Sequence, residues 1–206
     1  MRYPLYLPDN SKDVGGLLKR GETSAAIAEL RRRAALGSEP AKIVLAYLHL
    51  QGAIADQTNP EQAAALLQAP VTAENPYALY VMGWIYFLRD KDAKLAVQCW
   101  ISGANQDFTP SLVEVGRFLS WELPGKPANF KAAIDKLLLA HHLGHKQAPC
   151  LVAALDAQGA RGTLYTLTAG VRWIYFFLRL AFWAYVDPFS EHVFVRPLNQ
   201  KKPFFL

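Results

Sequence analysis

The chain has 206 residues, of which 52% are hydrophobic, and it carries a net charge of +5 at pH 7. This length is sufficient for one large core, or for one repeat domain with an appendage. Residues 164–206 carry five basic and two acidic groups, whereas residues 1–163 carry 17 and 15. The excess positive charge therefore belongs to the C-terminal part, and the lack of a basic helix face before it argues against a nucleic-acid partner.

Two features indicate a reducing compartment. Cys99 and Cys150 are far apart and form no CxxC motif, so a disulfide framework is not expected. The N-terminus has no apolar segment, and Pro4 and Pro8 argue against a signal peptide. We therefore expect the N-terminal part to be cytoplasmic.

Helical patterns begin close to the N-terminus. Residues 1–11 contain two prolines and are expected to be extended. A first helix pair is predicted at residues 11–20 and 23–36, because Gly21 separates two helical patterns and Gly37 is a typical residue at a helix C-terminus.

Four prolines then open successive units. They are 36, 34 and 39 residues apart, a spacing typical of helical solenoids: Pro40, Pro76, Pro110 and Pro149. First helices are predicted at residues 41–52, 77–88, 111–123 and 148–159. Second helices are predicted at residues 60–69, 92–104 and 129–144. The last unit has no second helix of the same type, and a hydrophobic segment follows it instead.

Small residues recur at one position of the first helices. Ala46, Gly83 and Gly116 are equivalent in the repeat. Glycine costs about 1 kcal/mol in a helix interior. Its recurrence therefore predicts a close approach of a neighbouring helix at this position.

These helix pairs resemble the Sel1-like repeat (SLR) family, a branch of the tetratricopeptide solenoids. The resemblance rests on Gly83 three residues before Tyr86 in a first helix, and on Ala96 with Trp100 in a second helix. The linkers LGS and LGH, at residues 36–38 and 143–145, also resemble the ends of family repeats. The resemblance covers about residues 12–160. It implies an α-solenoid that binds other proteins on a curved surface without catalysis or a cofactor, often as an adaptor.

The predicted fold is all-α. An extended segment (1–11) precedes an α-solenoid of helix-pair repeats (12–160). An aromatic-rich hydrophobic helix (164–186) and an extended tail (187–206), with a β-prone run at 192–195, complete the chain.

The sequence shows no motif of a catalytic, cofactor or metal site. His141 and His145 are four residues apart, which could present two imidazoles to a metal ion. His145 follows Gly144, however, so it is expected beyond the end of the helix, where histidine is favoured by the helix dipole. We therefore expect neither an enzyme nor a metal protein. Glu114 is expected to be solvated.

Aromatic and arginine side chains on the first helices are candidate partner contacts, because such residues dominate binding energies at interfaces. The candidates are Tyr80, Trp84, Arg117 and Trp121. The alternative is that Trp84 and Trp121 fill the core between repeats. For Arg117, the alternative is simple surface exposure.

Residues 164–186 would form a helix of about 34 Å, long enough to cross a bilayer. Arg172 and Arg179 oppose this, because each costs roughly 2.5–3.5 kcal/mol at the centre of a spanning helix. They fall within about 20° of each other on a helix, which gives it one narrow polar stripe. Three interpretations stay open: a helix lying in a membrane interface, a helix spanning the membrane, and a helix buried against the domain or a soluble partner.

The residues expected to face a membrane or a partner are Arg172, Trp173, Phe176, Phe177, Arg179, Phe182 and Trp183. The expected function is a non-enzymatic interaction scaffold at the cytoplasmic side of a membrane, the inner membrane in a bacterium. Its expected partners are proteins of a membrane-associated complex. The alternative is an accessory subunit or assembly factor of a membrane enzyme complex, with this helix buried against the enzyme.

Overall fold

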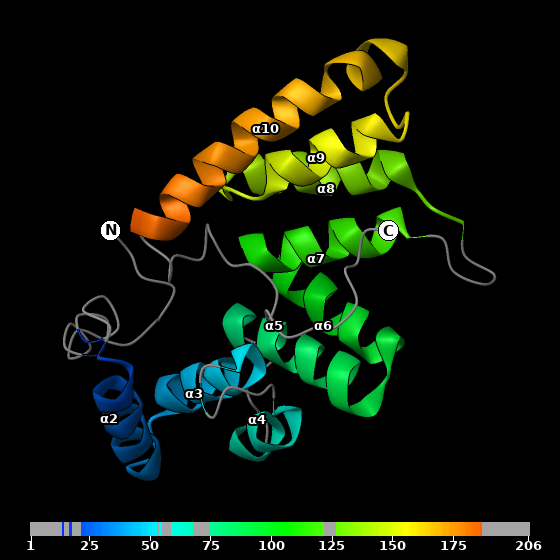
Figure 1. The fold of residues 1–206 in the computed structure, drawn as a ribbon. Helices are drawn as coiled ribbons and strands as arrows, with labels where there is room; N and C mark the ends of the chain where they lie inside the picture. The colour runs from blue at the N-terminus through cyan, green and yellow to red at the C-terminus, as the bar shows by residue number, and fades with distance from the viewer. Residues whose placement is uncertain are drawn as a thin grey trace. The chain divides into compact units, whose positions relative to one another are not determined.

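The computed structural model describes residues 22–52, 59–67, 75–121 and 127–186, together with Val14, Leu17 and Ile54 (Figure 1). All regular elements in these ranges are helices, which confirms the predicted all-α class. The chain divides into two compact units between Ala96 and Val97, and each unit is described by itself. The predicted segments 1–11 and 187–206, including the run at 192–195, lie outside the described residues.

The first unit is built from short helices that pack on their neighbours in the chain. They are α2 (Thr23–Ala35), α3 (Glu39–Gln51), α4 (Pro60–Leu66), α5 (Pro76–Ile85) and the π-helical turn η2 (Tyr86–Asp90). Helix α3 packs against α2, α4 and α5. Its inward face includes Val44 and Leu50, which are buried in the core.

Local signals set the ends of these helices. The side chain of Asn75 accepts hydrogen bonds from the backbone N–H groups of Tyr77 and Ala78, which caps α5 directly before Pro76. Helix α2 ends at Ala35, and Gly37 follows with φ 89°, as its predicted role at a helix C-terminus requires. The predicted helix 77–88 differs, because the α-helix ends at Ile85 and continues as η2.

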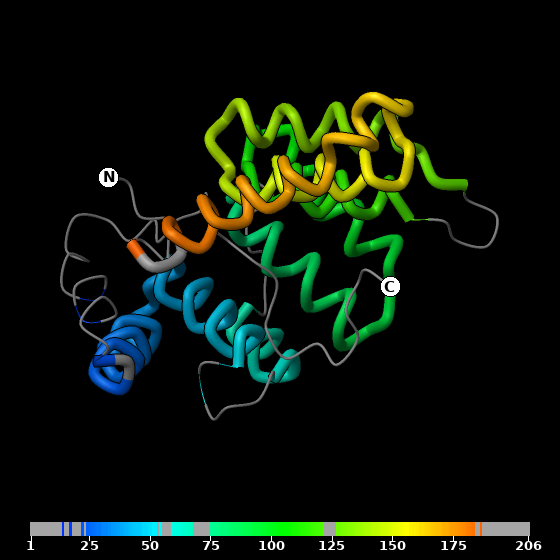
Figure 2. Tube along the Cα trace, turned by 45° about the horizontal axis from the view of Figure 1, so that its top comes forward, coloured from blue at the N-terminus to red at the C-terminus, as the bar shows by residue number. Residues whose placement is uncertain are grey.

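Helix α6 (Ala93–Ala104) contains the division between the units, and four helices follow in the second unit. They are α7 (Thr109–Ser120), α8 (Phe130–His142), α9 (Ala148–Ala157) and α10 (Thr163–Val186). Consecutive helices pack against each other from α7 to α10, as Figure 2 also shows. Helix α10 is therefore the second helix of a pair with α9, a partner that the sequence pattern did not reveal.

Gly116 marks the closest approach between α7 and α8. A Cβ atom at this position would lie 2.8 Å from Cγ of Leu137 and 3.2 Å from the carbonyl oxygen of Ala133. The predicted close packing at Gly116 is confirmed. The predicted end of this helix at residue 123 is wrong, because the backbone turns to an extended conformation at Trp121, with ψ 138°.

Cys150 is buried in α9, and burial raises the pKa of its thiol to about 11. Since the thiolate is the reactive form, we expect iodoacetamide at pH 8 to modify Cys150 roughly 100-fold more slowly in the folded chain than in urea. Mass spectrometry of the labelled peptide measures both rates. Equal rates in the two conditions would contradict this burial.

Candidate partner-binding face on α10

Helix α10 has a packed stripe that faces α9. Its members are separated by three or four residues and are buried or half-buried: Thr166, Ala169, Arg172, Phe176, Leu180 and Trp183. Ala169 is 1% exposed and lies where the two helices come together. This spacing is that of one helix face, so the packing fixes which side of α10 points outward.

A buried carboxylate fastens α10 to α9. The Asp156 side chain is 0% exposed, and its oxygens accept hydrogen bonds from Nε of Arg161 at 2.6 Å and from Nη1 of Arg172 at 2.8 Å. The hydroxyl of Thr166 donates to the Asp156 carbonyl oxygen at 2.9 Å. Burial alone would raise the pKa of Asp156, but the hydrogen bonds from both arginines outweigh it and lower the pKa. We call Asp156, Arg161 and Arg172 the Asp156 latch.

Two side-chain contacts support α10 further along its length. The His141 ring lies 6.3 Å from the Phe176 ring, and Nζ of Lys146 lies 4.8 Å from the centre of the Trp183 ring. Burial lowers the pKa of His141, and the positive charges of Arg179 and Lys146 lower it further. A small hollow between these groups is lined by Arg179 and Lys146 rather than by carboxylates, so its charge disfavours a metal cation.

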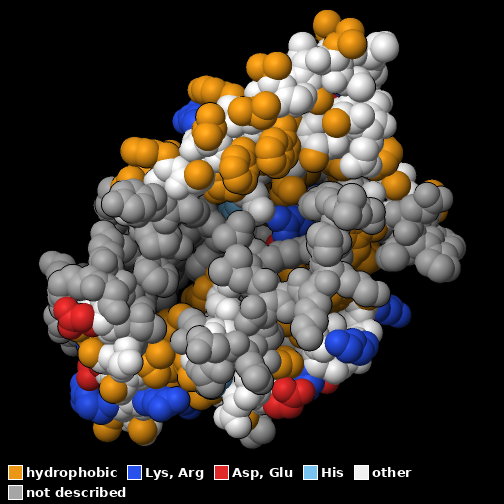
Figure 3. All heavy atoms as spheres, viewed as in Figure 1, with side chains coloured by type: hydrophobic (Ala, Val, Ile, Leu, Met, Phe, Trp, Pro, Cys, Tyr) orange, Lys and Arg blue, Asp and Glu red, His pale blue; other side chains and the backbone are white. Residues whose placement is uncertain are grey.

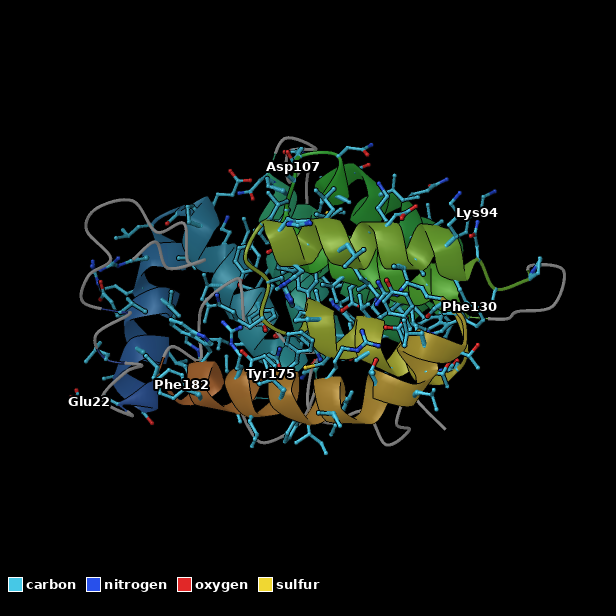
Figure 4. The ribbon with its side chains drawn as sticks, turned by 90° about the horizontal axis from the view of Figure 1, so that it is seen from above. Glu22, Lys94, Asp107, Phe130, Tyr175 and Phe182 are labelled. Carbon is cyan, nitrogen blue, oxygen red and sulfur yellow. The ribbon has the colours of Figure 1, made fainter. Side chains whose placement is uncertain are left out.

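The opposite side of α10 is apolar and open to solvent. Its residues are again three or four apart, and each is between 57% and 80% exposed: Leu164, Leu167, Val171, Ile174, Leu178 and Phe182. We call this set the outer stripe. On one flank the rings of Trp173 and Phe177 stack at 5.0 Å. Figure 3 shows hydrophobic side chains gathered over this helix, and Figure 4 labels Tyr175 and Phe182 on it.

Helix α8 shows what such a face looks like without this apolar pattern. Its packed face consists of Ala133, Ile134, Leu137 and Ala140. The side turned away from that face carries Lys131, Asp135, Leu139 and His142, all exposed. Two helices with the same place in a helix pair therefore differ in their outer faces, so the repeat architecture does not by itself require an apolar outer stripe.

The predicted contacts on the first helices lie in two different units. Tyr80 and Trp84 belong to the first unit and are each 1% exposed, as the core alternative for Trp84 expected. Trp121, in the second unit, is half-buried.

The expected exposure of Arg117 and the expected solvation of Glu114 are wrong. Both side chains are 4% exposed, and Nη1 of Arg117 donates to a Glu114 carboxylate oxygen at 3.2 Å. The cause is that α7 is buried on every side from Thr109 to Arg117, so the two opposite charges of this segment pair with each other. A buried side chain offers no surface to a partner.

The predicted set on the C-terminal helix is divided between its two faces. Arg172, Phe176 and Trp183 belong to the packed stripe, whereas Trp173, Phe177, Arg179 and Phe182 are exposed. The predicted set lacks the aliphatic members of the outer stripe, which are Leu164, Leu167, Val171, Ile174 and Leu178. Their regular spacing of three and four residues is the signal that would have identified them.

The predicted location at the cytoplasmic side of a membrane is wrong. Within the described part of the chain, no helix combines the length and the apolar character needed to cross a membrane. The two arginines lower the hydropathy of α10. In addition, Arg172 pairs with Asp156 of this chain rather than with a group in another protein.

Helix pairs that pack on their neighbours in sequence define a helical-repeat protein. The crystal structure of a Sel1 repeat protein from Oxalobacter formigenes aligns over 79% of this chain and 70% of its own length, at TM-score 0.58 and 16% identity. A protective antigen of uropathogenic Escherichia coli strains, with an SLR fold, aligns with 84% of this chain at TM-score 0.60 and 17% identity. The matching part is 38% of the antigen's length.

The chain therefore has the fold of Sel1-like repeat proteins, as its sequence resemblance predicted. No protein-family model matches the sequence, and no curated protein is similar to it by sequence comparison.

Proposed function

We propose that the protein is a non-enzymatic interaction scaffold that binds a protein partner on the outer stripe of α10. The observation that carries this proposal is a row of large apolar side chains, at least 57% exposed, directly opposite the face that packs on α9. Contiguous apolar surfaces of this kind mark interaction sites in soluble proteins. The Sel1-like fold supports the proposal, since helical solenoids present extended binding surfaces.

The proposed roles of the two segments follow the predicted boundaries. Residues 12–160 serve as the repeat scaffold, and residues 164–186 as the helix that meets the partner. The Asp156 latch holds this helix in a fixed direction, which lowers the entropy cost of binding. If the partner is an enzyme, the chain is its accessory subunit or assembly factor.

The spacing of the outer stripe indicates a helical partner surface. Apolar residues that alternate at three and four residues form the seam by which one helix packs along another. The stripe from Leu164 to Phe182 covers about 27 Å of helix at 1.5 Å per residue. We therefore expect a partner helix of about five turns with its own apolar stripe.

A matched pair of double variants tests the proposal in the full chain. Leu167→Glu with Leu178→Glu places two carboxylates on the outer stripe. Leu139→Glu with Leu143→Glu places one on α8 and one directly after its last residue, and both leucines are also exposed. Quantitative crosslinking in cells of the source organism should show partners that the first variant loses and the second retains. Circular dichroism checks that both variants are folded.

The proposal is wrong if folded α10 and α8 variants retain the same crosslinked partners as the unchanged chain. It is also wrong if both variants lose them equally, because partner binding would then not depend on the outer stripe.

A further inference from the structure

We infer that the partner on the outer stripe is a second copy of this chain, and that the two α10 helices pair side by side in antiparallel directions. This inference rests on the proposed function and names the occupant of the same face. Its elements are the symmetry of the stripe, its size and the position of its charges.

The four central residues of the outer stripe have a spacing that reads alike in both directions. From Leu167 the steps are four, three and four residues, ending at Leu178. The midpoint lies between Val171 and Ile174. When a second helix runs the opposite way about this midpoint, Val171 meets Ile174 of the second copy.

The same two-fold operation places Leu167 against Leu178 of the second copy, and Leu164 within one residue of Phe182. Each level of the interface then joins one apolar side chain to another. An interface related by a two-fold axis is the commonest arrangement in protein dimers, because one self-complementary surface serves both chains.

The size of the surface matches the need of a stable dimer. The six residues of the outer stripe, with the stacked rings of Trp173 and Phe177, are all at least 42% exposed. At an area on the order of 100 Å² each, they offer roughly 800 Å² per chain, which is the area that a standard interface buries on each partner.

The charges favour the antiparallel direction. Helix α10 has no acidic residue, and its cations are Arg172 and Arg179. Arg172 is paired with Asp156, so Arg179 is the cation whose distance from its own copy decides between the two directions. In a parallel pair the two Arg179 side chains would be level with each other. In the antiparallel pair they are about 20 Å apart along the axis, beyond the screening length of about 8 Å in physiological salt.

Sedimentation equilibrium of the purified full chain tests the pairing. The unchanged chain should be a dimer, and Leu167→Glu with Leu178→Glu should weaken its self-association by about 100-fold or more. The α8 variant Leu139→Glu with Leu143→Glu should dimerise like the unchanged chain. A monomer at every concentration would overturn the inference, as would dimers of equal strength in both variants.

Single cysteines test the direction. Val171→Cys lies about 2 Å along the axis from the midpoint, so a short thiol crosslinker should join two copies. Phe182→Cys should not crosslink, because its two copies would be about 28 Å apart. The unchanged chain, with Cys99 and Cys150, gives the background. Crosslinking through both positions would indicate a parallel pair and overturn the inference, as would the absence of a crosslink through Val171→Cys.

The outcomes also separate this inference from the proposed function. The purified chain could be a monomer while the outer-stripe variant still loses crosslinked partners in cells. That result would overturn the inference of a second copy alone, and a different protein would then bind the stripe. If a chain ending at Val186 dimerises while the full chain does not, residues 187–206 occupy the stripe, and the inference fails for the full chain.

Discussion

Asp156→Asn should lower the free energy of unfolding by about 2–3 kcal/mol and loosen α10 from α9. Removing one partner of a buried ion pair costs about 3–5 kcal/mol, because the remaining charge is left without compensation. We expect a smaller loss here, since the side chains of Arg161 and Arg172 are 25% and 28% exposed and can turn to water. Urea denaturation gives the free energy, and hydrogen exchange of the α10 amides reports the loosening.

Asp135→Asn is the matched control, because Asp135 is exposed on α8. Its effect should stay within about 0.5 kcal/mol, as is usual for surface substitutions. If the two variants unfold at the same urea concentration, the Asp156 latch does not hold the helix.

The Asp156 latch also makes the stability of the fold depend on pH. The folded pKa of Asp156 lies below its ordinary value, so the latch contributes fully above that ordinary value. The contribution is lost as the pH falls through the folded pKa. The protection factors of the α10 amides, which correct for the intrinsic pH dependence of exchange, should therefore fall on acidification in the unchanged chain, and Asp156→Asn should remove that part of the fall.

Gly116→Ala should destabilise the protein by about 1–3 kcal/mol, although alanine is the better helix former by about 1 kcal/mol. The added Cβ would lie 2.8 Å from Cγ of Leu137, so α7 and α8 must separate or Leu137 must leave its rotamer. Thermal unfolding followed by circular dichroism measures the change.

Gly170→Ala provides the opposite case within the same unit. No atom lies within 4 Å of a Cβ at Gly170, so only the helix preference acts, and stability should rise by up to about 1 kcal/mol. If Gly116→Ala and Gly170→Ala both stabilise the protein, α7 and α8 do not approach as closely as the 2.8 Å distance to Leu137 implies.

Local signals suffice to predict most of the fold. Pro76 and Asn129 stand at the starts of α5 and α8, and apolar periodicity continues between such starts and the glycines that follow. The ends of helices are less predictable. Trp121 continues the apolar pattern of α7, yet its backbone is extended. The burial of Arg117 is not encoded locally either, because it depends on how completely its neighbours cover α7.

The candidate site was predictable in its location but not in its orientation. Aromatic residues identify residues 164–186 as a surface that needs a partner. The sequence does not show that Arg172 reaches Asp156, because that ion pair exists only when α9 and α10 pack together. Once it forms, the polar stripe turns inward and the aliphatic stripe turns out. The orientation therefore follows from one tertiary contact.

The Asp156 latch joins residues at most 16 positions apart, from Asp156 to Arg172. Closing so short a loop costs little entropy, and contacts between sequence neighbours form early in folding. On the ribosome, α10 can therefore begin to dock on α9 soon after Arg172 has left the exit tunnel, before the rest of the helix has emerged from it. Misassembly of nascent chains through this apolar helix is limited to the short period in which its direction is not yet fixed.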